Sequence, residues 1–274
     1  MTEGGGRPAE TYTHGHHASV VGQHQRRTAE EAAAFLLPRL NAGDRLLDFG
    51  CGPGTITTGL ARAVAPGPVV GLDIVHEVLA LARDHVAEQQ SANTLLTQGS
   101  VYDLPFADAT FDAAYAHQVL QHLADPVAAL REARRVLRPG GLVAVRDADY
   151  ATMVWWPREP RMERWLELYH AVATRNGGEA NAGRRIPSWL REAGFERVET
   201  TTGTWHFDDR DSILQWGDSW AERLTQSALA RQAIDYGLAT VEELAEIASG
   251  WREWARQPDA FFTFIHVAGL ARRP

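Results

Sequence analysis

The sequence predicts an α/β fold in which a mostly parallel sheet carries helices on both faces and ends in an antiparallel strand pair with a helical cap insertion. Three observations lead to this prediction. Short apolar stretches alternate with helix-like stretches through the first half of the chain, a pattern that gives a parallel sheet covered by helices. A glycine-rich turn, 50–54, separates the first apolar stretch from its helix. In the second half, two strand-like stretches flank a long helical segment.

The chain begins with a stretch, 1–27, that lacks apolar periodicity and is expected to form an irregular N-terminal arm. Thr28 and Glu31 then have the spacing of a capping box, in which the threonine hydroxyl and the glutamate carboxylate satisfy each other's otherwise unpaired amides at a helix start. We therefore expect a helix over about 28–40, immediately before the core of the fold.

Strands and helices alternate from there on. Apolar stretches bounded by turn signals predict strands, and apolar residues at helical spacing predict helices. The strands are expected at 45–49, 68–74, 94–98, 111–116 and 142–145, with helices after Gly54 and at 77–89 and 126–137. A chain of 274 residues can bury one sizeable core, so we expect one domain that carries a cap.

The second half of the chain has a different character. All nine tryptophans lie between Trp155 and Trp254. Strands are expected at 197–207 and 261–271, with helices between them. The predicted organisation is therefore as follows: an arm (1–27), a core (28–207), a helical cap insertion (208–256) and a final strand of the core (257–274).

Composition and charge exclude several classes of function. The formal charge is −8 and the isoelectric point is near 5.8, and the arginines fall in separated pairs instead of one dense stripe. Nucleic acid is therefore not an expected partner, because phosphate neutralisation needs clustered positive charge. No apolar run approaches the ~18 residues of a membrane-spanning helix, and no apolar signal-peptide centre follows Met1. We expect a cytoplasmic protein without a membrane span.

The few possible metal ligands do not form a recognisable site. Cys51 is the single cysteine, so no internal disulfide and no CxxC cluster can form. His14, His16 and His17 lie close together in the arm, but they lack an acid or a further ligand at useful spacing. No bound metal is expected.

The strongest functional signal is the glycine-rich turn. Gly50, Gly52 and Gly54 have G-x-G-x-G spacing, and Asp48 stands two residues before the first glycine. Glycine allows the backbone to approach a ligand closely. A dinucleotide site would have G-x-G-x-x-G spacing, and an acid at Asp48 would repel its pyrophosphate. The turn therefore favours a ligand with a cationic amino-acid group over NAD(P).

This turn resembles motif I of the class I methyltransferases that use S-adenosylmethionine (SAM), and the resemblance implies a Rossmann-like sheet. It continues through four ordered motifs over 46–147 and is strongest to the ubiquinone-biosynthesis type and its small-molecule relatives. The stretch 69–74 is similar to the family's second strand, which implies that Asp73 binds both ribose hydroxyls of SAM. Asp73 follows Gly50 by 23 residues, close to the ~20 typical of a ribose-binding acid.

Three further stretches resemble motifs of the same family. The stretch 99–106 is similar to the loop that holds the adenine, with Ser100 in place of the usual acid, and 111–126 and 137–141 resemble the fourth strand with its helix and the turn into the fifth strand. Cys51 is interpreted as a small packing residue of the glycine turn. The resemblance implies SAM as the cofactor, and the expected cofactor-binding residues are Asp48, Gly50, Cys51, Gly52, Gly54, Asp73, Ile74, Ser100, Val101 and His117.

His122 and Asp147 are the candidate catalytic residues. One follows the fourth predicted strand and the other ends the fifth, so both can face the transferred methyl group. In related O-methyltransferases a histidine and an acid at these places are implicated as a pair in which the carboxylate orients a histidine base. The alternative is structural: His122 caps its helix turn and Asp147 binds loop amides. The sequence leaves both readings open.

The acceptor site is expected to include residues from both ends of the chain. His14 and His17 in the arm are either solvated or cover the substrate. Trp155 and Trp156 come directly after the fifth predicted strand and are candidate substrate contacts. Four other tryptophans have the helical spacing of core faces and are assigned to the core of the cap: Trp216, Trp220, Trp251 and Trp254.

The resulting hypothesis is a SAM-dependent methyltransferase that transfers a methyl group to an O, N or C atom of a small, apolar metabolite by in-line displacement. Two other functions remain open: a non-catalytic SAM-binding or sensing module and an NAD(P)-dependent oxidoreductase on a similar sheet. A homo-oligomer is compatible with the sequence.

Overall fold

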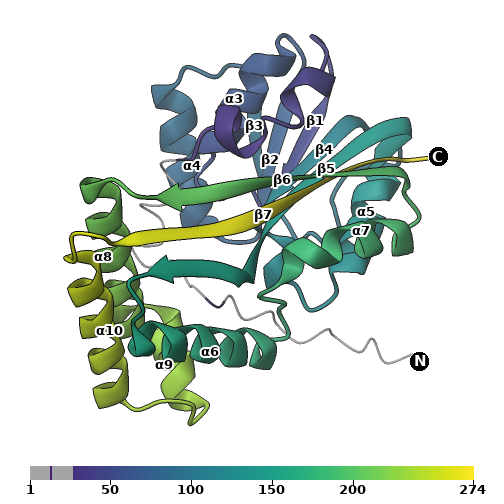
Figure 1. Cartoon of the computed structure of the whole chain (residues 1–274). Helices are drawn as coiled ribbons and strands as arrows, with labels where there is room; N and C mark the ends of the chain where they lie inside the picture. Colours follow the sequence, from purple (N-terminus) through teal and green to yellow (C-terminus); the bar gives the residue numbers. More distant parts are fainter. Residues whose placement is uncertain (1–12, 14–26) are drawn as a thin grey trace.

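The computed structural model describes Thr13 and residues 27–274. Its centre is a seven-stranded sheet with the order β3-β2-β1-β4-β5-β7-β6. In Figure 1 the parallel strands lie at one end of the molecule and the helices α8, α9 and α10 at the other. The predicted fold class is confirmed, since the sheet is parallel through β5 and then ends in antiparallel strands.

The parallel half forms largely as expected. Its first strands are β1 (Leu46–Phe49), β2 (Val69–Asp73), β3 (Thr94–Gln98) and β4 (Phe111–His117). The helices between or after them are α3 (Thr55–Val64), α4 (His76–Glu88) and α5 (Pro126–Val136). All four residues of β1 are buried, as a strand covered on both faces requires. The carboxyl ends of β1, β2 and β4 therefore meet at one edge of the sheet.

The helix expected over 28–40 is interrupted. The structure has a short helix α2 (Ala29–Ala32) and a 3-10 turn η1 (Leu37–Arg39). Thr28 does cap α2, because its hydroxyl accepts a hydrogen bond from the Glu31 amide. The Ala32 carbonyl, which a continuing helix would use, instead accepts hydrogen bonds from the Tyr115 hydroxyl at 2.9 Å and from Arg146 at 3.4 Å. Contacts to the sheet thus replace the helix ladder here.

The fifth strand is much longer than predicted. β5 (Leu137–Trp156) has 20 residues, whereas the apolar stretch covered only 142–145. Its pairing with β4 ends at Arg146, and the strand continues as the antiparallel partner of β7 (Phe261–Arg272) as far as the pair Trp156 and Phe261. The expectation that the strand ends at Asp147 is therefore wrong, because β7 supplies backbone partners that the sequence pattern of β5 does not reveal.

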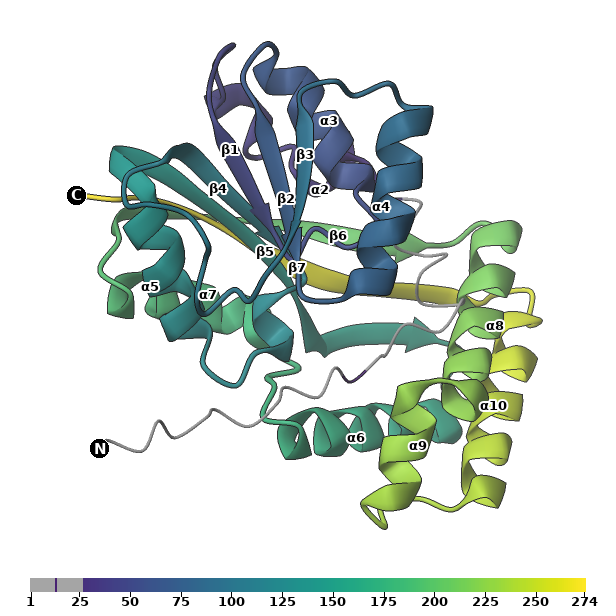
Figure 2. The ribbon, with the colours of Figure 1, turned by 180° about the vertical axis from the view of Figure 1, so that it is seen from behind.

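The predicted strand pair with its helical connection is confirmed. β6 (Glu196–Phe207) pairs with β7 in antiparallel register. Between them lie α8 (Arg210–Gln226), α9 (Ala228–Asp235) and α10 (Val241–Ala255). The helix α6 (Pro160–Arg175), which the sequence division placed in the core, contacts α9 and α10. Figure 2 shows these four helices grouped beyond the parallel half of the sheet.

Three apolar clusters hold the elements together. The first joins α2 and α3 to one face of the sheet, and the second joins α5 and α7 (Ala182–Glu192) to the other. The third, the cap cluster, joins the far parts of β5 and β7 to the helices α6, α8, α9 and α10. The predicted core role of four tryptophans is confirmed, since this cluster buries all of them: Trp216, Trp220, Trp251 and Trp254.

Candidate functional site

The glycine turn lies at the carboxyl end of β1, between the strand and α3. Gly50, Gly52 and Gly54 all have positive φ angles, of 75°, 55° and 78°, a region that other residues enter only at a cost. A side chain on Gly50 would collide with Val119, whereas no atom lies within 4 Å of the position that a Cβ on Gly52 would take. The backbone at Gly52 thus borders open space in which a ligand can approach it.

Asp73 ends β2 and reaches the glycine turn. One carboxylate oxygen accepts a hydrogen bond from the Gly52 amide at 3.0 Å, and the other accepts one from the Val75 amide at 3.0 Å. The neighbouring Ile74 is 62% exposed, which is unusual for a large apolar side chain. The structure therefore joins the glycine turn, an acid and an exposed apolar surface at one place.

Asp48 and Cys51 lie beneath this surface. The Asp48 carboxylate accepts a hydrogen bond of 2.6 Å from the Thr57 hydroxyl in α3, and burial raises the pKa of the carboxyl to about 7. The Cys51 sulfur would lie 3.1 Å from a Cβ on Gly71, and the thiol is buried with its pKa raised by that burial. Both side chains thus pack against the buried side of the glycine turn and help to hold it in place.

The loop after β3 contains Ser100 and Val101. The Ser100 hydroxyl accepts a hydrogen bond of 3.2 Å from the Tyr102 amide, and the backbone of Ser100 forms an isolated antiparallel β-bridge with that of Asp103. Val101 is half-buried against the second apolar cluster. The serine that replaces the family's usual acid is therefore engaged within its own loop in this structure.

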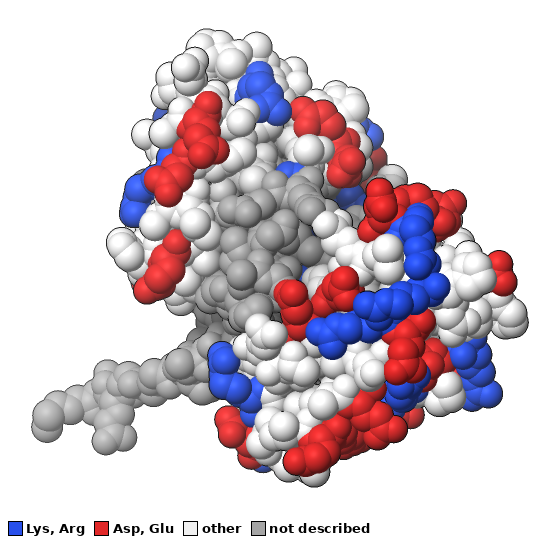
Figure 3. Space-filling view, turned by 90° about the vertical axis from the view of Figure 1, so that its left-hand side faces the viewer, with Lys and Arg blue, Asp and Glu red and all other residues white. Residues whose placement is uncertain are grey.

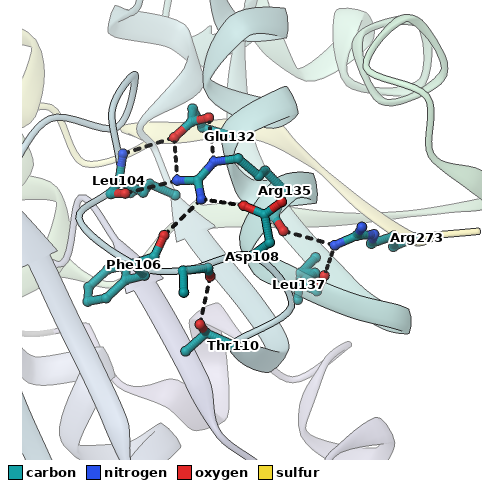
Figure 4. A network of polar contacts seen from close by, with 9 residues as sticks. Leu104, Phe106, Asp108, Thr110, Glu132, Arg135, Leu137 and Arg273 are labelled. Carbon is teal, nitrogen blue, oxygen red and sulfur yellow. Dashed lines mark hydrogen bonds and ion pairs between the residues drawn. The ribbon is translucent and has the colours of Figure 1, made fainter.

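Arg135 of α5 holds the next part of that loop, a role that the sequence analysis missed. Its guanidinium donates to the Leu104 carbonyl at 2.9 Å and to the Phe106 carbonyl at 2.8 Å. Glu132 accepts hydrogen bonds from both Arg135 and the Leu104 amide, as Figure 4 shows. Hydrogen bonding to Arg135 lowers the pKa of Glu132. The i, i+3 spacing of the two residues was the available signal, but it did not reveal the loop as their target.

His117 ends β4 beside the glycine turn. Its ring is buried and stacks between those of Tyr115 and His266, with centroid separations of 6.5 and 6.3 Å. The ring plane therefore lies over the sheet face that carries α2, not over the opposite face with α5.

His122 and Asp147 meet at the turn η2 (Leu120–His122), which follows β4. Asp147 is fully buried, and its Oδ1 accepts a hydrogen bond of 3.1 Å from the Gln121 amide. Burial raises the pKa of Asp147 to about 7. Burial, followed by the charge of Arg27, lowers the pKa of His122 to about 3. Asp147 thus binds the amides of the turn that carries His122.

The predicted substrate contacts lie apart from this edge or outside the described residues. His14 and His17 are not among the described residues. Trp155 stacks on Phe262 at 6.2 Å within the cap region, and Trp156, 61% exposed, receives a hydrogen bond on its carbonyl from Trp254. Both tryptophans belong to the far end of β5, because the strand is longer than predicted.

A chain of polar contacts at the boundary between core and cap was also missed. Arg27 donates a hydrogen bond of 2.5 Å to the side-chain oxygen of Gln118, directly after β4, and the Gln118 side-chain nitrogen lies 2.8 Å from Nε2 of His266 in β7. These residues are far apart in the sequence, so no local pattern marks them.

No helix among residues 27–274 is long and apolar enough to cross a membrane. Within the same part of the chain, no group of three or more His, Cys, Asp or Glu side chains is placed to hold a metal ion.

The methyltransferase domain family matches residues 47–145. An uncharacterized methyltransferase of Schizosaccharomyces pombe is 34% identical over 254 residues, which cover 89% of each chain. An O-methyltransferase of Penicillium expansum is 31% identical and covers 83% of this chain and 80% of its own. The solved structure of the YcgJ protein from Bacillus subtilis has a TM-score of 0.60 at 19% identity, over 89% of this chain and 99% of that one.

The matched segment contains the glycine turn, Asp73 and the loop that Arg135 holds. Similarity to the S. pombe methyltransferase extends well beyond that segment, to 89% of the chain. Fold, site and relatives agree, and the chain therefore belongs to the class I SAM-dependent methyltransferases.

Proposed function

We propose that this enzyme transfers a methyl group from SAM to an O, N or C atom of a small, apolar metabolite. The observation that carries the proposal is the junction of the glycine turn with Asp73. A carboxylate can accept hydrogen bonds from ribose hydroxyls, the exposed Ile74 offers an apolar surface to the adenine, and the space beside Gly52 leaves room for the rest of the cofactor. The residues assigned to direct cofactor contact are Gly50, Gly52, Asp73, Ile74 and Val101.

The other residues assigned to the cofactor act from behind or beside it. Asp48 and Cys51 support the glycine turn, and Gly54 begins α3. Ser100 and His117 border the same edge of the sheet, at the ends of β3 and β4. Arg135 joins this set as a positioning residue, because it holds the loop that follows Val101.

The proposed reaction needs little help with proton transfer. SAM supplies a methyl group on a sulfonium that is already activated, so the enzyme mainly aligns the acceptor and excludes water. His122 is a weak base while its pKa is near 3, and Asp147 holds the turn beneath it. We therefore assign Asp147 to positioning and His122 to the wall of the acceptor site.

Three observations support a small acceptor. The net charge of −8 opposes nucleic acid. Over the face in Figure 3, acidic and basic side chains are interspersed and form no large patch of one sign. The similar protein from P. expansum is named an O-methyltransferase, which is consistent with an acceptor oxygen.

Transfer of labelled methyl from SAM into fractionated cell extract tests the proposal. We expect label in low-mass metabolites, and label only in protein or RNA would refute the small-molecule acceptor. Binding of SAM and of NAD, each measured by calorimetry, tests the two alternative functions. Tight binding of NAD but not SAM would favour the oxidoreductase alternative, and SAM binding without any transfer would favour the sensing module.

A further inference from the structure

The contacts from Arg27 through Gln118 to His266 have a fixed direction. A guanidinium can only donate hydrogen bonds, so the Gln118 oxygen must face Arg27, at 2.5 Å. The amide NH2 group of Gln118 then faces His266 and donates to its Nε2 over 2.8 Å. Nε2 is therefore the unprotonated nitrogen of that ring.

The remaining proton of the neutral ring must sit on Nδ1. His266 is fully buried. Burial, together with the nearby charges of Arg146 and Arg27, holds its pKa well below the ordinary range, so the ring is neutral at physiological pH. The contacts with Arg27 and Gln118 thus leave the His266 ring with one hydrogen-bond donor, its Nδ1–H group.

This donor has no hydrogen-bond partner among the described residues. A buried donor without an acceptor destabilises the folded state, and native structures seldom leave one. The rings around it are aromatic: Trp205 at 4.5 Å, Phe264 at 4.8 Å and His117 at 6.3 Å between centroids. Flat aromatic rings therefore lie around this donor, with the charged groups of Arg27 and Arg146 nearby. Aromatic side chains combined with a few polar groups are typical of the lining of small-molecule sites.

The position of the donor places it next to the proposed methyl-transfer edge. Gln118 directly follows β4 and has a left-handed φ of 55°, a strained conformation of the kind that clusters at functional sites. The next residue, Val119, packs against Gly50 of the glycine turn. Gln118 and Trp205 are only half-buried, so the boundary between core and cap reaches the surface beside them.

We propose that His266 is a specificity-determining residue whose Nδ1–H donates a hydrogen bond to an oxygen atom of a ring-containing methyl acceptor. Arg27 and Gln118 are positioning residues that hold the histidine in the required tautomer. The inference rests on the proposed small-molecule methyl transfer, but it concerns recognition of the acceptor and not the chemistry of the methyl group.

The tautomer can be tested without knowing the acceptor. Proton–nitrogen correlation spectra of the histidine-labelled full chain, assigned with His266→Phe, should show a protonated Nδ1 and an unprotonated Nε2 for His266. Gln118→Ala should let the ring exchange between tautomers, whereas Gln98→Ala, on the exposed side of β3, should leave it unchanged. A protonated Nε2 in the unaltered protein would overturn the proposal.

Recognition of an oxygen is tested with α-tetralone and tetralin, two matched ring compounds of which only the first has a carbonyl. At equal concentrations, α-tetralone should shift the Nδ1–H resonance and tetralin should not. His266→Asn keeps a donor near the Nδ1 position and should retain α-tetralone binding, whereas His266→Gln and His266→Phe should weaken it about threefold to tenfold, the range expected for one hydrogen bond.

Equal responses to α-tetralone and tetralin, or equal loss in all three variants, would overturn the proposed role of His266. SAM affinity of each variant, measured by calorimetry, separates this failure from failure of the proposed function. It should stay within about twofold of the unaltered protein if His266 acts on the acceptor, and a parallel loss of SAM binding would instead indicate a general structural role.

Discussion

The glycine turn with Asp73 and the polar chain at the core–cap boundary are built in different ways. The first consists of residues close together in the sequence or at the ends of adjacent parallel strands, and backbone amides complete it. The second joins side chains separated by 91 and 148 residues. The proposed cofactor side of the site is thus determined by local sequence, and the proposed acceptor side only by tertiary packing. Such an arrangement allows the acceptor side to vary while the cofactor side is kept.

The largest expected effect comes from Asp73→Ala, which removes the central carboxylate of the cofactor side. SAM binding should weaken by roughly 1.5–3 kcal/mol, or about tenfold to 150-fold, the value of hydrogen bonds to a charged group. Calorimetry measures it, with Asp84→Ala on the exposed face of α4 as the matched control. An unchanged SAM affinity in Asp73→Ala would remove the ribose assignment.

Arg135→Ala tests whether a residue that only holds the loop after Val101 affects SAM binding as strongly as a residue proposed to contact SAM. The change leaves the Leu104 and Phe106 carbonyls without their arginine donor. We expect the midpoint of thermal unfolding to fall and SAM affinity to drop by about tenfold, equivalent to about 1.4 kcal/mol. Arg83→Ala, an exposed arginine of α4, serves as the control. Loss of stability with unchanged SAM affinity would limit Arg135 to a structural role.

Asp147→Asn separates the two roles considered for the His122 and Asp147 pair. The folded-state pKa of Asp147 is about 7, whereas an unfolded carboxyl titrates near 4. The contribution of this group to stability is therefore fully present below about pH 4 and is lost as the pH rises to 7, since only the unfolded state ionises in that window. An asparagine amide is uncharged, like the protonated acid. The free energy of unfolding of Asp147→Asn should therefore fall less between about pH 4 and pH 7 than that of the unaltered protein.

Unfolding by urea at several pH values measures the effect, and methyl transfer is followed in the same samples. Asp48→Asn is the companion variant, because burial raises the pKa of Asp48 to about 7 as well. If Asp147 positions the turn, activity at neutral pH is retained in Asp147→Asn. A loss of activity by orders of magnitude, with stability retained, would show instead that an ionised carboxylate orients a catalytic histidine.

The smallest expected effect is that of Arg27→Gln on His122. Burial is the main cause of the low pKa of His122, and the Arg27 charge adds to it. Without that charge the pKa should rise from about 3 but stay below the ordinary histidine value. A titration followed by the ring resonances of His122 measures the shift. No shift at all would place Arg27 too far away to act on this side of the site.

The same contrast explains how much the sequence could predict. Strand and helix periodicity and glycine spacing are local, so the parallel half, the turn at Gly50 and the position of Asp73 could be predicted. The length of β5 could not, because its far part depends on pairing with β7. The break after Ala32 likewise depends on a hydrogen bond from Tyr115. His266 reads in the sequence as one more residue of a strand, and only packing gives its ring nitrogens different roles.

The unusual length of β5 has a mechanical consequence. The strand runs from Leu137, beside β4, to Trp156 in the cap region, with β7 paired along both parts. β5 therefore pairs with β4 in the parallel half of the sheet and extends into the cap region, so one continuous strand links the two regions. The pairing of β5 with β7 has a register shift between Asp149 and Val154, and we expect bending of the strand in the cap region to concentrate there. A chimaera that exchanges only the helices between β6 and β7 should keep the relative placement of the parallel half and the cap region. A chimaera joined inside β5 would interrupt the strand that links them.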